Sequence, residues 1–146
     1  MIRLAVGALV LLGCAHAPVT TEAPMTDAPW STIGIADGSA NFHRFTRGAD
    51  GRVKYAYVPV TPEQSSTGFY SGGPPRAEDL AANDARLVEL WDLLRKLEAD
   101  PTKHTPDRAK GTGAISWEGA AGKREFIILR GAELDGLLKL LSGFGK

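Results

Sequence analysis

Cysteine is almost absent from this sequence, since Cys14 is the only one among 146 residues. No intramolecular disulfide can therefore form, and the folded part must be held by its own hydrophobic core. An excess of one charge is also lacking, because 17 basic side chains balance 17 acidic ones. This balance gives no electrostatic reason to expect nucleic acid or an anionic membrane surface as a partner.

The short motifs of common catalytic and metal chemistry are lacking as well. The sequence contains no nucleophile elbow G-x-S-x-G, no H-E-x-x-H, no C-x-x-C and no phosphate loop G-x-x-x-x-G-K-[ST]. Its 3 histidines, His16, His43 and His104, do not have the spacing of metal ligands. We therefore expect no bound metal, no cofactor and no enzymatic activity.

A membrane-spanning run is lacking too, because the longest uncharged apolar stretch covers only residues 4–12. A helix needs ~20 apolar residues to cross a bilayer. Residues 4–12 follow Arg3 and have the length of the apolar region of a signal peptide. The stretch ends at Leu11-Leu12-Gly13-Cys14, which resembles the lipobox of bacterial lipoproteins. In that motif, a Leu three residues before the cysteine and a small residue just before it fit the lipoprotein signal peptidase.

This resemblance implies that residues 1–13 are a signal peptide and that Cys14 becomes a lipidated N-terminus. A thioether-linked diacylglycerol and an amide-linked acyl chain would then hold the protein in the membrane, at ~0.8 kcal/mol for each buried CH₂ group. Because Ala15 is not Asp, sorting in Gram-negative cells favours the outer membrane, on its periplasmic or surface face, over the inner membrane. The alternative is an ordinary secretory leader cut at the A-x-A-like site Ala15-His16-Ala17, which would discard Cys14.

Residues 14–29 are predicted to form an extended tether. Prolines at positions 18, 24 and 29, with Thr and Ala between them, neither build a helix nor bury much apolar surface. Removal of the leader takes away Arg3 and leaves 16 basic against 17 acidic groups, a net charge of about −1. Residues 30–146 are then long enough for a single domain but not for two.

Strand-like alternation predicts two hairpins in this domain. A short strand at residues 32–35 precedes a hairpin from about Phe42 to Val58, which turns at residues 48–51. Phe42 and Phe45 are three residues apart, so a bulge would be needed to place both rings on one face. The second hairpin joins residues 112–118 to residues 124–129. Its last strand is apolar on both faces, which predicts a central place in the sheet.

Apolar residues at three- and four-residue spacing predict two helices. The first begins near Ala77 or Asp84 and ends at Ala99, and its apolar stripe places Trp91 in the core. The second covers roughly residues 134–141. We therefore predict an α+β fold, with a mainly antiparallel four- to five-stranded sheet and two helices packed on one face, in the order β-β-α-β-β-α.

Part of the sequence repeats, because residues 48–58 align without gaps on residues 119–129 and a predicted helix follows each segment. Duplication of a hairpin-helix unit is one explanation, and turn chemistry common to unrelated hairpins is the other. The order of elements resembles that of small secreted inhibitors of bacterial metallopeptidases such as the emfourins, which also end in a strand pair followed by a Leu-rich helix. This is a resemblance of fold alone.

The loop at residues 61–75 is the strongest candidate for a functional surface, because loops of this length in compact domains are usually functional or disordered. Phe69 and Tyr70 stand within it among Ser, Thr and Gly residues. Their rings either fold back as a lid on the sheet or anchor a binding surface. The candidate binding residues are Ser65, Ser66, Phe69, Tyr70, His43 and Arg108.

Three functions remain open. The favoured one is a lipid-anchored cell-envelope protein that binds an envelope protein or another ligand through the loop at residues 61–75, without catalysis. The second is an inhibitor of secreted peptidases that places this loop, or the tether, in a protease cleft. The third is a small enzyme with a site near His43, His104 and Arg108.

Overall fold

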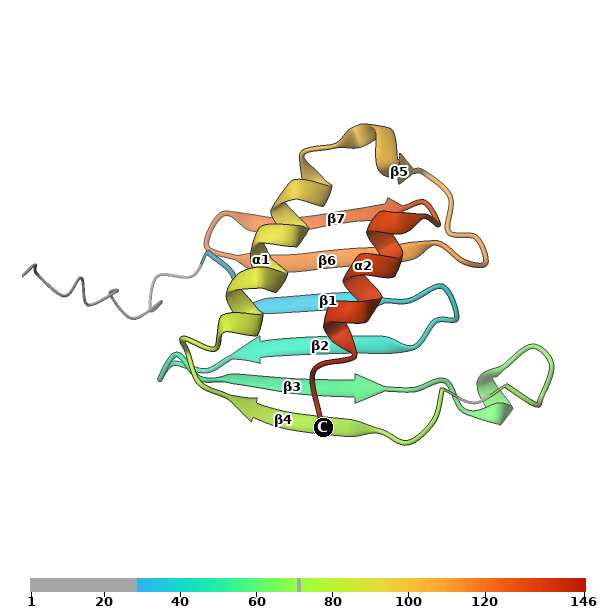
Figure 1. Cartoon of the computed structure of the whole chain (residues 1–146), viewed down its shortest axis with the longest axis horizontal. Helices are drawn as coiled ribbons and strands as arrows, with labels where there is room; N and C mark the ends of the chain where they lie inside the picture. Colours follow the sequence, from blue (N-terminus) through green and yellow to red (C-terminus); the bar gives the residue numbers. More distant parts are fainter. Residues whose placement is uncertain (1–28, 71) are drawn as a thin grey trace, which may run out of the picture.

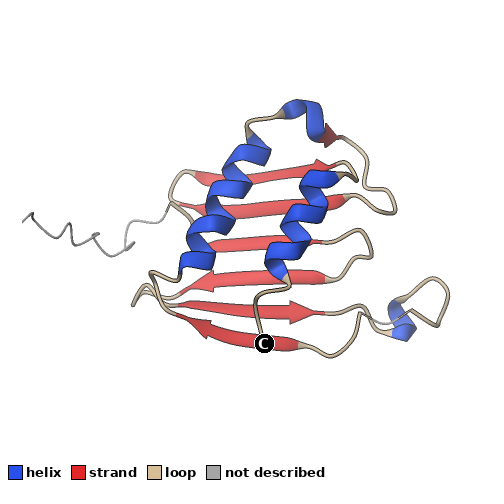
Figure 2. Ribbon diagram, viewed as in Figure 1, coloured by secondary structure: helices blue, strands red, loops and turns tan. Residues whose placement is uncertain are grey.

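A computed structural model describes residues 29–70 and 72–146. Seven strands form one antiparallel sheet in the order β4-β3-β2-β1-β6-β7-β5, and both helices lie on the same face of it (Figure 1, Figure 2). The strands are β1 (Thr32–Ala36), β2 (Phe42–Arg47), β3 (Val53–Val58), β4 (Arg76–Leu80), β5 (His104–Thr105), β6 (Gly113–Gly119) and β7 (Gly122–Ile128), and the helices are α1 (Ala85–Glu98) and α2 (Ala132–Leu141). Two short 3₁₀ turns cover Pro62–Gln64 and Pro101–Lys103.

The predicted α+β class, the antiparallel sheet and the two helices are confirmed. The predicted four to five strands and the order β-β-α-β-β-α are wrong, because seven strands run in the order β-β-β-β-α-β-β-β-α. The short strand expected at residues 32–35 is present as β1. The strands that apolar alternation did not reveal are β4 and β5, which lie at the two edges of the sheet.

Strand β4 lies where the sequence pattern allowed a helix to begin at Ala77. Its residues pair with β3, from Arg76 opposite Tyr57 to Leu80 opposite Val53. Leu80 is its one buried side chain. An edge strand that buries so little shows no apolar alternation, so its sequence looks like a polar helical turn.

Helix α1 begins after Asp84, the later of the two predicted starts. The Asp84 carboxylate accepts a hydrogen bond of 2.9 Å from the Arg86 amide, which satisfies one of the free donors of the first turn. Trp91, which was predicted to lie in the core, is only half-buried. Its ring packs edge-on against Trp117 at a centroid distance of 5.3 Å, so it borders the core rather than filling its centre.

Alternate residues of each strand point to the helix-covered face of the sheet, where the core lies. Phe45 is fully buried on this face and pairs with Ile33 on one side and Tyr55 on the other. Phe42 pairs with Val58 and points to the opposite, open face. The register is continuous between the two phenylalanines, so their rings lie on different faces and no bulge is needed.

Strand β7 does not take the central place that its apolar run predicted. It lies second from the edge, and only the two-residue β5 lies outside it. Strand β5 pairs with Ile127 and Ile128 alone, while the residues from Gly122 to Glu125 stay exposed. The apolar end of β7 therefore reflects local cover at that end and not a position in the middle of the sheet.

The core lies between the helix-covered face and the two helices. Phe144, which follows α2, is fully buried, and its ring centroid lies 5.0 Å from that of Phe45 and 5.4 Å from that of Tyr55. Burial of each such side chain stabilises a fold by ~1.5–3 kcal/mol. The largest fully buried side chains are Trp30, Tyr55, Phe45, Phe144, Ile33, Ile35, Leu80, Leu87, Leu90, Leu94, Ile115 and Ile128.

The two hairpins that align in sequence do not share a register. Arg47 pairs with Val53 across residues 48–52 in the first, whereas Gly119 pairs directly with Gly122 in the second. A change of register by one residue moves every side chain of one strand to the other face. The two turns differ in length and the registers do not match, which argues against duplication of a whole unit.

The predicted signal peptide, the lipidation site at Cys14 and all but the last residue of the predicted tether lie outside the described residues, which begin at Pro29. Neither helix of the described ranges has the length and apolar character needed to cross a membrane.

Candidate functional site

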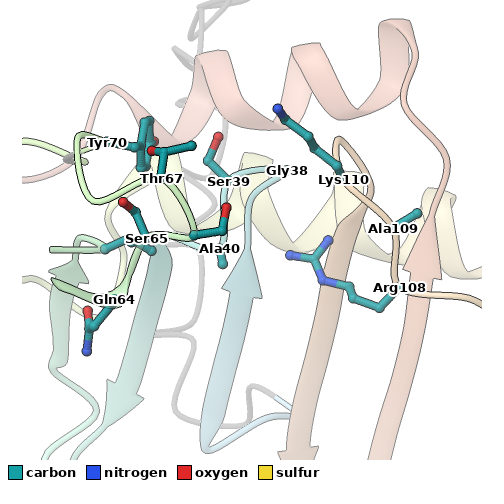
Figure 3. A pocket seen from close by; sticks show the side chains of 12 residues that line it. Gly38, Ser39, Ala40, Gln64, Ser65, Thr67, Tyr70, Arg108, Ala109 and Lys110 are labelled. Carbon is teal, nitrogen blue, oxygen red and sulfur yellow. The ribbon is translucent and has the colours of Figure 1, made fainter. Parts of the chain in front are cut away.

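Three connections between strands meet at one end of the sheet and enclose a cleft of about 440 Å³ (Figure 3). They are the β1–β2 turn at residues 37–41, the β3–β4 loop at residues 59–75 and the β5–β6 loop at residues 106–112. The cleft exists only because β1 and β6, which are distant in sequence, are neighbours in the sheet. Its lining residues are Gly38, Ser39, Ala40, Val60, Gln64, Ser65, Ser66, Thr67, Tyr70, Arg108, Ala109 and Lys110.

The cleft lies at the end of the sheet away from the first described residues. The Ser31 amide donates to the Glu118 carbonyl at 2.7 Å, and the Ser31 carbonyl accepts from the Arg47 amide at 2.8 Å. Both partners border hairpin turns at the far end of the sheet (Figure 1). Strand β1 then leads to the cleft over 5 residues, or ~17 Å at ~3.4 Å per residue. The chain therefore enters at one end and the cleft opens at the other.

Asn41 joins the β1–β2 turn to the β3–β4 loop. Its side chain is 3 % exposed, and its Nδ2 donates to the Tyr70 hydroxyl at 2.8 Å and to the Asp37 carboxylate at 2.7 Å. Its Oδ1 accepts from the Val60 amide at 2.9 Å. A buried amide whose donors and acceptor are all satisfied fixes the groups around it. Both ends of the loop are therefore held against the turn.

A second set of hydrogen bonds closes the base of the loop. The Gly72 amide donates to the Val60 carbonyl at 2.9 Å, and the Tyr57 hydroxyl donates to the Gly72 carbonyl at 2.8 Å. A Cβ atom on Gly72 would lie 2.0 Å from Asn41 Oδ1 and 2.8 Å from Pro59 Cβ. Only glycine allows the loop to approach Asn41 this closely.

Phe69 and Tyr70 occupy different environments in the loop. Tyr70 lines the cleft with its hydroxyl held by Asn41, and it is 39 % exposed. Phe69 is 93 % exposed. Neither ring is buried against the sheet, so the predicted lid arrangement is not formed.

The cleft brings together part of the predicted binding set. Ser65, Ser66, Tyr70 and Arg108 line it. Phe69 stands beside it, and His43 lies elsewhere in the core. Sequence reasoning missed the lining residues of the other two connections, such as Lys110, because nothing local in the sequence indicates which loops the strand order will place together.

Arg108 reaches from the β5–β6 loop to the β1–β2 turn. Its guanidinium donates to the carbonyl and the hydroxyl of Thr112 and, at 2.6 Å, to the Asp37 carbonyl. All these acceptors are neutral, so no carboxylate offsets the positive charge in these contacts. Arg108 therefore braces two walls of the cleft and keeps its charge there.

The same two connections touch through their backbones. The Gly111 amide donates to the Gly38 carbonyl at 3.1 Å, and a Cβ on Gly38 would lie only 2.7 Å from Gly111 Cα. Ala40 also lines the cleft, and its backbone has φ 66, in the left-handed region. This conformation costs an L-residue about 1–2 kcal/mol. Strain of this kind is characteristic of functional sites that the surrounding structure holds in place.

His43 is buried on the helix-covered face of the sheet and does not line the cleft. Its Nδ1 lies 2.9 Å from the Tyr55 hydroxyl, and its ring centroid lies 4.8 Å from that of Tyr57. Burial lowers the pKa of His43 to about 4, with the Asp37 carboxylate opposing and Arg76 assisting the shift. Burial also raises the pKa of Tyr55 to about 12. This predicted binding residue is therefore a neutral core histidine at pH 7.

His104 lies too far from His43 to share a site with it. Strands β2 and β5, which carry them, are separated by β1, β6 and β7, or by ~19 Å at ~4.8 Å per strand. His104 instead stacks on Phe126 at a centroid distance of 4.6 Å, with its Nε2 2.9 Å from the Leu97 carbonyl. The site expected from His43, His104 and Arg108 together is not assembled.

Within residues 29–70 and 72–146, no cluster of three or more His, Cys, Asp or Glu side chains is arranged to hold a metal ion. Comparison of the chain with protein-family models, with curated proteins and with solved structures found no match. What the site can do must therefore be argued from its own geometry.

Proposed function

We propose that this chain is a lipid-anchored protein of the cell envelope that acts as a non-catalytic binding module, with the cleft as its ligand site. The proposal depends on one observation above all, the way in which Asn41 holds the β3–β4 loop. This long loop is fixed near both ends by part-buried hydrogen bonds to Asn41, yet it exposes Phe69 and lines a cleft. Rigid scaffolds that position exposed loops in this way commonly serve binding.

The chemistry of the lining side chains supports binding more than catalysis. They supply hydroxyl and amide groups, one aromatic ring and two cations. Among these described lining residues there is no His, Asp, Glu or Cys to serve as a general base or an activated nucleophile. The arrangement is suited to holding a polar ligand in place.

The place of the cleft supports the anchored arrangement. If Cys14 carries the lipid, the chain that follows it joins the sheet at Ser31, at the end opposite the cleft. An anchor at one end and a binding site at the other leaves the site accessible to partners away from the membrane.

The lipid anchor is tested by mass spectrometry of the protein purified from the envelope of an expressing bacterium. The expected N-terminus is Cys14 with a diacylglycerol and an acyl chain, and the Cys14→Ser variant should lose that mass. An unmodified N-terminus downstream of Cys14 would refute the anchor.

The binding role is tested by in-cell photo-crosslinking. A photoreactive residue replaces Thr67 in the cleft or, as a control of the same residue type, Thr46 on the open face of the sheet. A binding module should give a discrete adduct from position 67 and none from position 46. Equal labelling at both positions, or no adduct from either, would count against the cleft as the binding site.

One observation favours the second function, a peptidase inhibitor. Phe69 is 93 % exposed on a loop whose base is fixed. An exposed side chain on a rigid loop can enter a protease subsite with little loss of entropy. Titration of the purified protein against a panel of secreted metallopeptidases, compared with its Phe69→Ala variant, decides this. Absence of inhibition at micromolar concentration would dismiss it.

A further inference from the structure

The side chains that line the cleft include two cations and no carboxylate, and Glu63 and Asp107 lie on the same loops but outside the lining. The two cations are Arg108 and Lys110. Arg108 is bound only to neutral oxygen atoms, and Lys110 takes part in none of the ion pairs of the described residues. The cleft is therefore electropositive in a chain whose overall charge is balanced.

The carboxylate of Asp37, in the β1–β2 turn, is already engaged. It accepts from the Ser39 amide at 2.8 Å, from the Asn41 amide at 2.9 Å and from Asn41 Nδ2 at 2.7 Å. All three donors belong to the same turn. An anionic group of a ligand would be a suitable partner for the Lys110 ammonium and the Arg108 guanidinium.

The remaining polar groups of the cleft are hydroxyls and an amide. Side chains of one wall face those of the other across the cleft, with Ser65 and Thr67 on one side and Ser39 and Lys110 toward the other (Figure 3). Hydroxyl and amide groups both donate and accept hydrogen bonds, so they can pair with the hydroxyl groups of a sugar, which do the same. The ring of Tyr70 adds an apolar surface for a pyranose ring.

The shape of the cleft favours a saccharide over a peptide. It lies beyond the strand ends, between loops, so a peptide could not extend the sheet there as an added strand. Besides two alanines, Val60 is its only aliphatic lining residue, which leaves no pocket for apolar peptide side chains. Its volume of about 440 Å³ lies in the range of ~300–1,000 Å³ that is usual for small-molecule sites.

We propose that the cleft binds an acidic saccharide, with its carboxylate or phosphate at Lys110 and Arg108, its hydroxyls on Ser39, Ser65 and Thr67, and its ring against Tyr70. This inference rests on the proposed binding function and names the ligand class for the same site.

The experiment titrates the purified full-length protein, solubilised in detergent, by calorimetry. The probes are glucuronate, N-acetylmuramate and glucose 6-phosphate, each compared with its neutral parent sugar, and inorganic phosphate alone. At least one acidic sugar should bind roughly tenfold or more tightly than both its neutral parent and inorganic phosphate, because a charge-assisted contact and the hydroxyl contacts are then made together.

Variants locate the binding. Lys110→Met should weaken binding of the acidic sugar roughly tenfold, because one charge-assisted contact is lost. It should leave the melting temperature unchanged, because Lys110 forms no ion pair with the residues that the structure describes. Lys139→Met, on the exposed side of α2, is the matched control and should have no effect on affinity.

Each contrary outcome is informative. If an acidic sugar and its neutral parent bind with equal affinity, the ligand need not be anionic and that claim is wrong. If inorganic phosphate binds as tightly as the acidic sugars, the claim that the ligand is a saccharide is wrong. Absence of binding by every probe overturns both. If no probe binds but position 67 still gives a discrete crosslink in cells, the binding function stands and this ligand class is rejected. An unmodified Cys14 would refute the lipid anchor without affecting the ligand class.

Discussion

The Nδ2 of Asn41 donates to the hydroxyl of Tyr70 at 2.8 Å, although the two residues are 29 positions apart in the sequence. This contact joins the β1–β2 turn to the β3–β4 loop. The same side chain accepts from the Val60 amide, so one residue holds both ends of a long loop. The loop is thereby ordered without being covered. Polar contacts hold its base, and Phe69 stays 93 % exposed.

The first prediction concerns this anchor. Asn41→Ala should lower the free energy of unfolding by ~1–3 kcal/mol, because it leaves buried partners unsatisfied, while Tyr70→Phe should cost only ~0.5–1.5 kcal/mol for one lost hydrogen bond. Phe69→Ala, at an exposed position, should change it by less than ~0.5 kcal/mol. Urea unfolding of the three variants measures the order, and a large loss with Phe69→Ala would assign that ring to the core.

The second prediction concerns Gly72. Gly72→Ala places a methyl group against the Asn41 side chain and should push the loop away from the turn, because the two cannot both keep their positions. We expect faster amide exchange and proteolytic cleavage across residues 61–70. Gly136→Ala is the control, since its added methyl meets no heavy atom within 4 Å apart from the adjacent residues and the backbone of its own helix, and alanine favours a helix. Unchanged loop exchange in Gly72→Ala would contradict the anchoring role.

The third prediction concerns acid. The pKa of His43 falls from 6.5 to about 4 on folding, so the unfolded chain binds its proton at a higher pH than the folded chain does. The contribution of His43 to stability is therefore complete above pH 6.5 and is lost as the pH falls toward 4, by ~3 kcal/mol in total at 1.36 kcal/mol per pKa unit.

The measurement is denaturant unfolding at pH 7 and pH 4.5 for the natural protein and for His43→Gln. The glutamine keeps a hydrogen-bonding group near Tyr55 but does not titrate, so the variant should lose less stability between these pH values than the natural protein. Identical pH slopes would show that His43 already carries its proton in the fold or that other groups dominate.

The fourth prediction concerns Arg86, which binds Glu78 and Asp84 at 2.7 Å each and the Gly143 carbonyl at 3.0 Å. Its hydrogen bonds lower the pKa of both carboxyl groups. Arg86→Lys cannot make all these contacts at once and should lose ~1–2 kcal/mol at neutral pH, because lysine lacks the planar fork of donors.

The loss in Arg86→Lys should shrink in acid, since the two carboxylates contribute their stability above their ordinary pKa range and lose it as they become protonated. Arg95→Lys is the matched control, because the pair of Arg95 with Glu98 is long, 3.6 Å, and exposed. Urea titrations at neutral and acidic pH measure both variants. Equal losses in the two variants would show that the Arg86 network contributes no more than a surface pair.

Local sequence patterns predicted the elements that bury a periodic apolar face and missed those that do not. Leucines at helical spacing located α1 and α2, and turn glycines located the hairpins. Strand β4 was missed because only Leu80 is buried in it, so polar edge residues resembled a helical turn. The place of β7 was misjudged because an apolar run can reflect local cover as well as a central position.

The cleft was predictable only within its own segments. The loop at residues 61–75 and Arg108 were singled out by composition, but their proximity depends on the pairing of β1 with β6, which no local pattern specifies. His43 was placed in the binding set, although its position two residues before Phe45 puts both on one face of β2. That spacing could have identified it as a core residue.

The separation between Ser31 and the cleft also determines how the proposed binding should be measured on a sensor chip. Attachment at the amino terminus leaves the cleft at the end of the sheet away from the chip surface. Attachment through surface lysines would instead modify Lys110 in some molecules and, under the proposed function, prevent those molecules from binding. Binding measured on the two kinds of chip should differ in capacity rather than in affinity.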